Sequence, residues 1–150
     1  MKRSFYELTF YELVKTLKKN NLNESGAKLL FNWHYKQKRT SPCVTDLAKE
    51  TRKYLLDNFD FVLPKIDQIF ESSDKTVKFL FKLHDGCYVE TVLIPFKNRY
   101  SICLSSQVGC AMKCSFCFTG TQGYKRNLKT SEIVGQYLEV YRWLEANRLN

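Results

Sequence analysis

The sequence predicts a protein of mixed α+β to α/β class, in which a helical N-terminal part precedes a β-hairpin and a strand–loop–helix unit. Three observations support this prediction. Apolar residues repeat with the period of a helix up to about residue 58, alternate with the period of a strand from residue 76, and return to a helical period after residue 130. The length of 150 residues suits one domain or two small ones.

The helical part is predicted to hold three helices. Thr9 and Glu12 fit a capping box at the start of the first helix, and the apolar residues at positions 10, 13, 14 and 17 then share one face. A second helix is expected from about Ser25 to Tyr35. A third is expected from a cap at Thr45 to about residue 58.

The predicted hairpin begins with a strand from Thr76 to Leu83. Asp85-Gly86 is a strong turn signal, and the return strand is expected from Cys87 to Ile94. After a turn from Pro95 to Asn98, a short strand is predicted from Tyr100 to Leu104.

A domain boundary is expected near Ser72-Ser73-Asp74. This divides the chain into a helical domain at 1–73, a hairpin linker at 74–98 and a strand–loop–helix unit at 99–150. In the last unit a long loop runs from 105 to 129, and the final helix begins near Ser131 with Thr130 as its cap and Glu132 at its positive end. One strand and one helix are a single step of a parallel sheet, so either this unit packs on the preceding strands alone or the chain is a piece of something longer.

Composition and charge exclude several classes of protein. With 44% hydrophobic and 26% charged residues the chain has the composition of a globular protein, not of a disordered one. It holds no apolar run long enough for a membrane span and no signal peptide, so we expect a cytoplasmic protein. The 24 Lys and Arg against 15 Asp and Glu give a net charge of +9, which favours a nucleic acid as partner.

Three of the six cysteines form the pattern C-x3-C-x2-C, at Cys110, Cys114 and Cys117. Thiolates suit zinc, copper(I) and iron–sulfur clusters. A structural zinc site needs a fourth ligand, which Cys103 or a histidine (His34 or His84) could supply. An electron-transfer cluster normally has four protein ligands. Three ligands would instead leave one iron of a [4Fe–4S] cluster open to a substrate or cofactor.

This loop resembles the cluster loop of the radical S-adenosylmethionine superfamily. The stretches Cys103–Cys110 and Thr119–Leu128, with Val89–Val92 and Ile94-Pro95 before them, resemble the ribosomal RNA adenine-C2 methyltransferases. The resemblance is dense over residues 87–137 and looser over 1–86. It implies the N-terminal portion of such an enzyme, with a helical RNA-binding accessory domain and the first βα unit of a partial (β/α) barrel.

The resemblance also implies roles for single residues. Cys110, Cys114 and Cys117 would hold a [4Fe–4S] cluster whose open iron binds S-adenosylmethionine. Cys103 would resolve a covalent protein–RNA intermediate through a disulfide bond, and Glu90 would accept a proton. One departure is Phe118, where the family has a small residue.

The implied reaction is methylation of adenine C2 in 23S ribosomal RNA, and in some cases transfer RNA, through a methyl-cysteine intermediate. Adenine C2–H is not acidic and its carbon is not nucleophilic, so a radical adds the carbon, a base removes the proton and a thiol releases the protein. S-adenosylmethionine would be both methyl donor and radical source, with a reducing donor such as flavodoxin, and the enzyme would be a monomer without a membrane partner. Because the family's methyl-carrying cysteine lies near its C-terminus, we expect the present chain alone to be inactive. A related enzyme methylates C8, so the position on adenine stays open.

Several residues have structural alternatives to these roles. Glu90 could form a cross-strand ion pair with Lys78 or Lys82, and Cys103 could be a small buried strand residue. Cys43 and Cys87 are expected to be structural. Near the loop, Lys125 and Arg126 could bind RNA, and Arg126 could instead order the loop. The non-enzymatic alternative for the whole chain is an RNA-binding module with a structural zinc. The helical part also has basic residues that could form either an RNA-binding face or a merely solvated surface, and these are Lys28, Lys36, Lys38, Arg39, Arg52 and Lys53.

Overall fold

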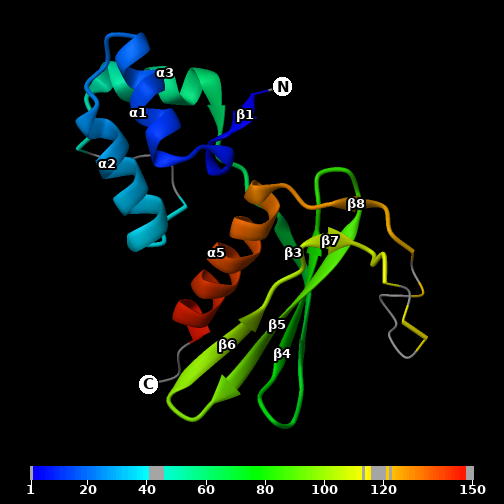
Figure 1. The fold of residues 1–150 in the computed structure, drawn as a ribbon. Coiled ribbons are helices and arrows are strands. Elements are labelled where there is room, and N and C mark those ends of the chain that lie inside the picture. Colours follow the sequence, from blue (N-terminus) through cyan, green and yellow to red (C-terminus); the bar gives the residue numbers. More distant parts are fainter. Residues whose placement is uncertain (1, 41–45, 113, 116–120, 122, 148–150) are drawn as a thin grey trace. The chain divides into compact units, whose positions relative to one another are not determined.

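The computed structural model describes residues 2–40, 46–112, 114–115, 121 and 123–147 (Figure 1). The chain divides into two compact units, Met1–Val62 (unit 1) and Leu63–Asn150 (unit 2). The boundary expected near Ser72-Ser73-Asp74 is therefore wrong. The segment before it forms a strand, Lys65–Glu71, which pairs with the first strand of the hairpin and so belongs to unit 2.

Unit 1 is mainly helical, as the sequence predicts. Its elements in chain order are β1 (Arg3–Ser4), a 3₁₀ turn η1 (Phe5–Glu7), α1 (Phe10–Lys19), α2 (Ser25–Phe31), a π-helical turn η2 (Asn32–Lys36), α3 (Lys49–Asn58) and β2 (Phe59–Asp60). The two short strands pair in parallel, with Arg3 opposite Phe59. This pairing joins the beginning and the end of the unit.

The start of α1 is the predicted capping box. The Thr9 hydroxyl accepts a hydrogen bond from the Glu12 backbone N–H at 3.2 Å, and the Glu12 carboxylate accepts one from the Thr9 backbone N–H at 2.8 Å. Hydrogen bonds from Thr9 lower the pKa of the Glu12 carboxyl. The second predicted helix is confirmed as α2 and η2. The third ends at Asn58 as predicted but begins at Lys49, and its expected cap, Thr45, lies outside the described residues.

The core of unit 1 contains a cluster of aromatic rings beside its buried leucines. Phe5, Tyr6 and His34 are completely buried, and the rings of Phe5 and His34 lie 4.8 Å apart. The ring of His34 also stacks with that of Phe61 at 5.5 Å, and its Nδ1 atom hydrogen-bonds the Tyr6 hydroxyl at 3.3 Å. Burial lowers the pKa of His34 to about 4. The imidazole is therefore neutral at neutral pH and packs as an aromatic ring.

The described part of unit 2 forms a four-stranded antiparallel sheet that packs with one long helix. The strands β3 (Lys65–Glu71), β4 (Val77–Lys82), β5 (Tyr88–Phe96) and β6 (Arg99–Cys103) pair in chain order. A two-stranded ribbon follows, made of β7 (Gln107–Val108) and β8 (Arg126–Asn127), and the unit closes with α5 (Thr130–Asn147). The predicted hairpin is confirmed as β4 and β5, although β5 continues through Pro95, where a turn was expected. The mixed α/β class is confirmed, and the barrel stays a prediction because every strand pair described in unit 2 is antiparallel.

The two faces of this sheet differ sharply. Burial alternates along β4 and β5, so that Phe79, Phe81 and Leu93 are fully buried on one face. That face packs with apolar residues of α5, of which Val140 is completely buried and Trp143 contacts Phe79 edge-to-face at 5.0 Å. The other face is exposed or half-buried along both strands. No helix in the described part of the chain is long and apolar enough to cross a membrane.

The neutral, buried His34 makes the stability of unit 1 depend on pH. The pKa of this histidine is 6.5 in the unfolded chain and about 4 in the folded protein. Between these two values the unfolded state binds more protons than the folded state, so the stability of unit 1 falls as the pH falls from 6.5 toward 4. We expect a loss of about 1.5 kcal/mol between pH 6.5 and about pH 5. Urea unfolding of a Trp143→Phe variant measures this, because Trp33 in unit 1 is then the only tryptophan.

A His34→Phe variant in the same background is the control. It keeps an aromatic ring between Phe5 and Phe61 but has no titrating group, so its stability should hardly change in this pH range. An equal loss in both proteins would show that another group is responsible.

Candidate active site around the cysteine loop

The loop that carries the three cysteines begins and ends at one β-ribbon. In this ribbon Gln107 pairs with Asn127 and Val108 with Arg126. The Lys125 backbone N–H also donates a hydrogen bond to the Val108 carbonyl at 2.9 Å. The sequence predicts one continuous loop from 105 to 129. That prediction is wrong, because residues 107–108 and 126–127 pair as the two strands of the ribbon. The segment that carries the cysteines therefore begins and ends at a fixed base.

At this base two glycines lie against each other. Gly109 and Gly123 both have a φ of +72°, in the left-handed region that favours glycine. A Cβ atom on Gly109 would overlap with the carbonyl oxygen of Gly123, whereas a Cβ on Gly123 would meet nothing within 4 Å. Gly109 is thus required for close contact between the two ends of the loop, directly before Cys110.

A buried amide holds the segment that leads into the loop. Gln136 of α5 is completely buried, and its Oε1 accepts hydrogen bonds from the Thr91 hydroxyl at 2.7 Å and from the Ser105 backbone N–H at 3.0 Å. Its Nε2 donates to the Ser105 carbonyl at 3.1 Å. One side chain therefore binds both backbone polar groups of Ser105, between β6 and the ribbon, and connects them to β5.

A buried carboxylate holds the segment that leaves the loop. Arg126 forms a two-pronged pair with Glu132 of α5, at 2.7 and 2.8 Å, and a further ion pair with Asp85 at 2.7 Å. The Nδ1 atom of His84 also lies 3.5 Å from Oε1 of Glu132. Burial opposes ionisation of Glu132, but hydrogen bonds from Arg126 and from the Lys129 backbone outweigh it and lower the pKa of the carboxyl. The bond from Arg126 lowers the pKa of Asp85 to about 2.

The structure describes two of the three loop cysteines. Cys110 and Cys114 are half-buried free thiols, and Cys117 lies outside the described residues. In the described ranges no three residues among His, Cys, Asp and Glu form a group that could hold a metal. The histidines named as alternative ligands have other surroundings, since His34 is in the core of unit 1 and His84 contacts Glu132.

Glu90 and Cys103 lie on the same face of the sheet. Cys103 of β6 is directly opposite Val92 of β5, and Glu90 precedes Val92 by two residues, so all three side chains leave the sheet on one side. This face is opposite to the one that packs in the core of unit 2. The sequence did not predict this proximity, because it depends on the register between β5 and β6.

The structure agrees with the structural alternative considered for Glu90 but not with the one considered for Cys103. Glu90 does form a cross-strand ion pair with Lys78, at 2.9 Å, and both side chains are about half exposed. The expected alternative for Cys103, a small buried residue, is wrong because Cys103 is an exposed free thiol. Cys87 is half-buried and packs against the core of unit 2, while Cys43 lies outside the described residues.

The two basic residues after the loop also differ. Lys125 is exposed. The guanidinium of Arg126 is occupied by Glu132 and Asp85, which is the loop-ordering contact considered as one of its two roles. Sequence reasoning missed Gln136 and Gly109. The signal available for Gln136 was a polar residue within the apolar pattern of the last helix, and for Gly109 a glycine directly before the first cysteine.

Comparisons with known proteins identify relatives along nearly the whole chain. No protein-family model matches. Over 97% of its length the chain is 43% identical to the dual-specificity RNA methyltransferase RlmN of Bdellovibrio bacteriovorus, of which it covers 37%. The chain is thus similar to RlmN along nearly its whole length. It is also 44% identical to RlmN of Geobacter sulfurreducens, over 90% of the chain and 38% of that protein.

A solved structure agrees with these RlmN relatives. The crystal structure of a radical SAM methyltransferase from Sphaerobacter thermophilus matches 97% of the chain and 44% of its own chain, with a TM-score of 0.85 and 35% identity. The resemblance to RNA methyltransferases of the radical type is thereby confirmed. The chain spans about two fifths of the length of the curated RlmN relatives that it matches.

Replacement of Gln136 by leucine should destabilise unit 2 by about 3 kcal/mol, because it leaves the buried Thr91 hydroxyl and the half-buried Ser105 backbone without these partners. Urea unfolding of a Trp33→Phe background, followed by Trp143 fluorescence, measures the loss. Gln107→Leu is the matched control. It removes only a bond to the exposed Asn127 side chain and should cost less than about 1 kcal/mol. Equal losses would contradict a special role for Gln136.

Replacement of Gly109 by alanine should open the base of the loop, whereas Gly123→Ala should only strain it by about 1–2 kcal/mol. Because both positions have the same φ, a difference between the two variants reports the overlap between the new Cβ atom at position 109 and the Gly123 carbonyl oxygen. Hydrogen exchange of the Lys125 amide measures the effect, since its bond to Val108 closes the base. Gly109→Ala should abolish its protection and Gly123→Ala should retain most of it. Similar protection in the two variants would refute the close contact.

Proposed function

We propose that this chain supplies the cluster loop and part of the active site of a radical S-adenosylmethionine enzyme that methylates adenine C2 in 23S ribosomal RNA and transfer RNA. The observation that carries the proposal is the C-x3-C-x2-C loop, fixed at both ends to α5, in a chain similar to RlmN. The names of the RlmN relatives support an RNA substrate, and the net charge of +9 is compatible with one.

The donor set fits a [4Fe–4S] cluster. Cys110 and Cys114 are free thiols of intermediate exposure, and Cys117 completes the pattern in sequence. Three thiolates leave one iron open, where the amino and carboxylate groups of S-adenosylmethionine would bind and the cluster would supply the electron for radical chemistry. The part played by this chain is to hold the loop rigidly, through Gln136, Arg126 and the glycine contact at its base.

Glu90 and Cys103 are proposed to act on the substrate. A carboxylate can accept the proton from adenine C2. An exposed thiolate can attack the sulfur of the thioether that joins protein and RNA, so that a disulfide forms between the two cysteines while the sulfur–carbon bond breaks. The carbon takes the electron pair of the broken bond and a proton, and becomes the methyl group of the released product. Both side chains leave the sheet on one face, which supports their action on one substrate. The ion pair with Lys78, at 2.9 Å, holds the Glu90 carboxylate on this face.

The rest of the reaction requires groups that this chain does not hold. The methyl-cysteine intermediate needs a further cysteine, which the resemblance assigns to the C-terminal part of the complete enzyme. The family resemblance also implies a reducing donor such as flavodoxin. The proposed activity is therefore that of a complete enzyme of which the two units form part.

Metal analysis of the chain tests the proposal directly. After anaerobic reconstitution with iron and sulfide, the chain should hold about four irons and four acid-labile sulfides. Cys110→Ala, Cys114→Ala and Cys117→Ala should each abolish this content, because three ligands are the minimum for such a site. Cys87→Ala is the matched control, since this thiol is also half-buried but packs against the core of unit 2, and it should leave the content unchanged.

One zinc per chain and no sulfide would overturn the proposal. The loop would then be structural, and an RNA-binding module with a zinc site would be the better function. A cluster that persists in the Cys103→Ala variant is also expected, because Cys103 lies on the sheet face with Glu90 and is not assigned to the cluster.

A further inference from the structure

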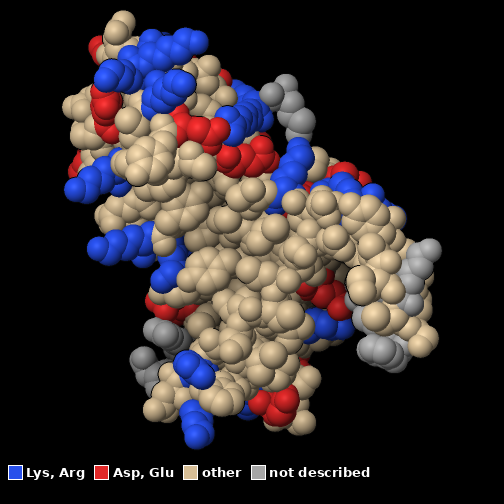
Figure 2. All heavy atoms as spheres, in the orientation of Figure 1, with Lys and Arg blue, Asp and Glu red and all other residues tan. Residues whose placement is uncertain are grey.

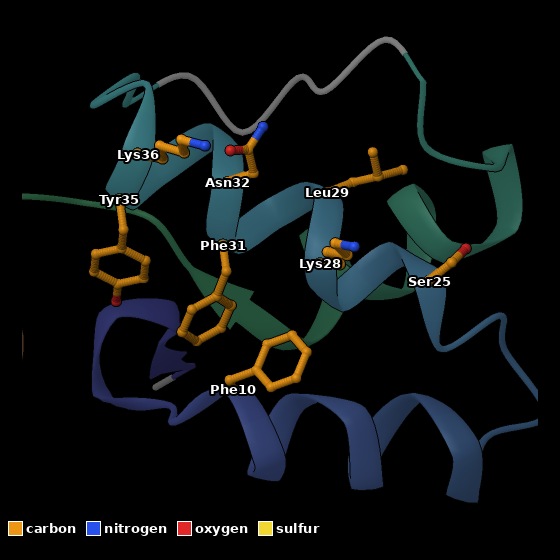
Figure 3. Close-up of a pocket in the computed structure, with 8 residues that line it drawn as sticks. All are labelled: Phe10, Ser25, Lys28, Leu29, Phe31, Asn32, Tyr35 and Lys36. Carbon is orange, nitrogen blue, oxygen red and sulfur yellow. The ribbon is translucent and has the colours of Figure 1, made fainter.

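An open groove lies on unit 1, far in sequence from the cysteine loop. It has a volume of about 1030 Å³ and is lined by residues of α1, α2 and η2, which are Phe10, Ser25, Lys28, Leu29, Phe31, Asn32, Tyr35 and Lys36 (Figure 3). Its size is that of a large ligand pocket. The groove is built from α1, α2 and η2 alone, so it belongs entirely to unit 1.

The wall of the groove is a continuous row of aromatic rings. Phe10 and Phe31 meet edge-to-face at 5.5 Å, and Phe31 and Tyr35 lie 5.0 Å apart. Figure 3 shows Phe10 reaching up from α1 while Phe31 and Tyr35 reach down from α2 and η2. Phe10 is 38% exposed although it begins an amphipathic helix, so its ring is available to a ligand.

The rim of the groove is basic. Lys28 and Lys36 are exposed, and neither forms an ion pair with a residue that the structure describes. From Ser25 to Thr40 the sequence contains no Asp or Glu, and unit 1 as a whole has twelve Lys and Arg against seven Asp and Glu. Figure 2 shows many of these basic side chains gathered over the helices of unit 1. The groove thus combines aromatic rings with uncompensated positive charge.

We propose that this groove binds single-stranded RNA, with an unstacked base against Phe10 and the adjoining phosphates on Lys28 and Lys36. Aromatic rings beside basic residues are the combination that binds single strands, because every base has a flat face and every linkage a negative charge. The amide of Asn32 and the hydroxyl of Ser25 offer hydrogen bonds to a base or ribose within the groove. A base paired in a duplex has no free face, so the groove selects unpaired RNA. This proposal rests on the proposed function, which supplies RNA as the substrate class.

Fluorescence anisotropy of the 150-residue chain with labelled RNA tests the proposal. The probe is an unstructured oligonucleotide of about ten nucleotides, and the same sequence as a duplex is the comparison. The single strand should bind more tightly than the duplex. Phe10→Ala should weaken its binding by about 10-fold, the effect of losing one stacked base. Tyr11→Ala is the matched control, since Tyr11 is 82% exposed on the same helix and does not line the groove.

The two lysines are tested by the dependence of binding on salt. A Lys28→Gln/Lys36→Gln double variant should reduce the slope of log K against log salt by about 1.4, because each phosphate contact on a single strand contributes about 0.7. A Lys15→Gln/Lys19→Gln variant removes the same charge from exposed positions outside the groove and should leave the slope nearly unchanged. Phe10→Leu, which keeps an apolar side chain without a flat face, replaces Phe10→Ala if thermal unfolding shows that the alanine variant is not folded.

Three results would overturn the groove as the binding site. They are tighter binding of the duplex, equal effects of the two lysine pairs, and equal effects of Phe10→Ala and Tyr11→Ala. These outcomes are independent of the cluster, whose iron and sulfide content is measured without RNA. A chain that holds the cluster but binds no single strand refutes only the groove, whereas a chain that binds RNA in the groove and holds zinc refutes only the radical enzyme.

Discussion

The hydrogen bonds of Glu132 and Gln136 fix the cysteine loop to the core of unit 2. The two side chains are one turn apart on α5 and both are buried, and between them they bind the backbone or the arginine at each end of the loop. Buried polar groups are costly unless they are fully paired, and here the partners come only from the native position of the loop. The helix also carries Val140 into the apolar core. The packing of α5 on the sheet therefore determines where the loop begins and ends.

The register of the sheet is the second constraint on the site. The hairpin between β5 and β6 closes through Lys97 and Asn98, with Phe96 opposite Arg99, and Lys97 adopts a positive φ of 48°. A two-residue connection of this kind fixes the pairing of every residue that follows. A shift of one residue would move Cys103 to the core face and away from Glu90. The catalytic geometry proposed for this sheet thus depends on a turn at the opposite end of β6.

Features that depend on neighbouring residues could be predicted from the sequence, and those that depend on distant contacts could not. The capping box of Thr9 and Glu12 and the Asp85-Gly86 hairpin are local, and both are present. Strand β3 was missed because it is an exposed edge strand without alternating burial, and its omission misplaced the domain boundary. The pattern of the last helix indicated an apolar face but not that Gln136 lies on it, since its partners Thr91 and Ser105 are more than thirty residues away. The roles of the cysteines came from resemblance, and only their surroundings are new.

In unit 1 the core lies in direct contact with the rings that line the groove, and this couples the two physically. The ring of Phe5 contacts His34 at 4.8 Å in the core, and it also contacts Phe31 at 5.9 Å and Tyr35 at 6.4 Å in the wall of the groove. The aromatic wall therefore has its inner side in the same cluster that keeps His34 neutral. Protein interiors are close-packed, so a charge on His34 disturbs the rings behind the groove as well as the stability of the unit. The position of the rings in the groove therefore depends on the packing of the whole helical unit, just as the position of the cysteine loop depends on the packing of α5.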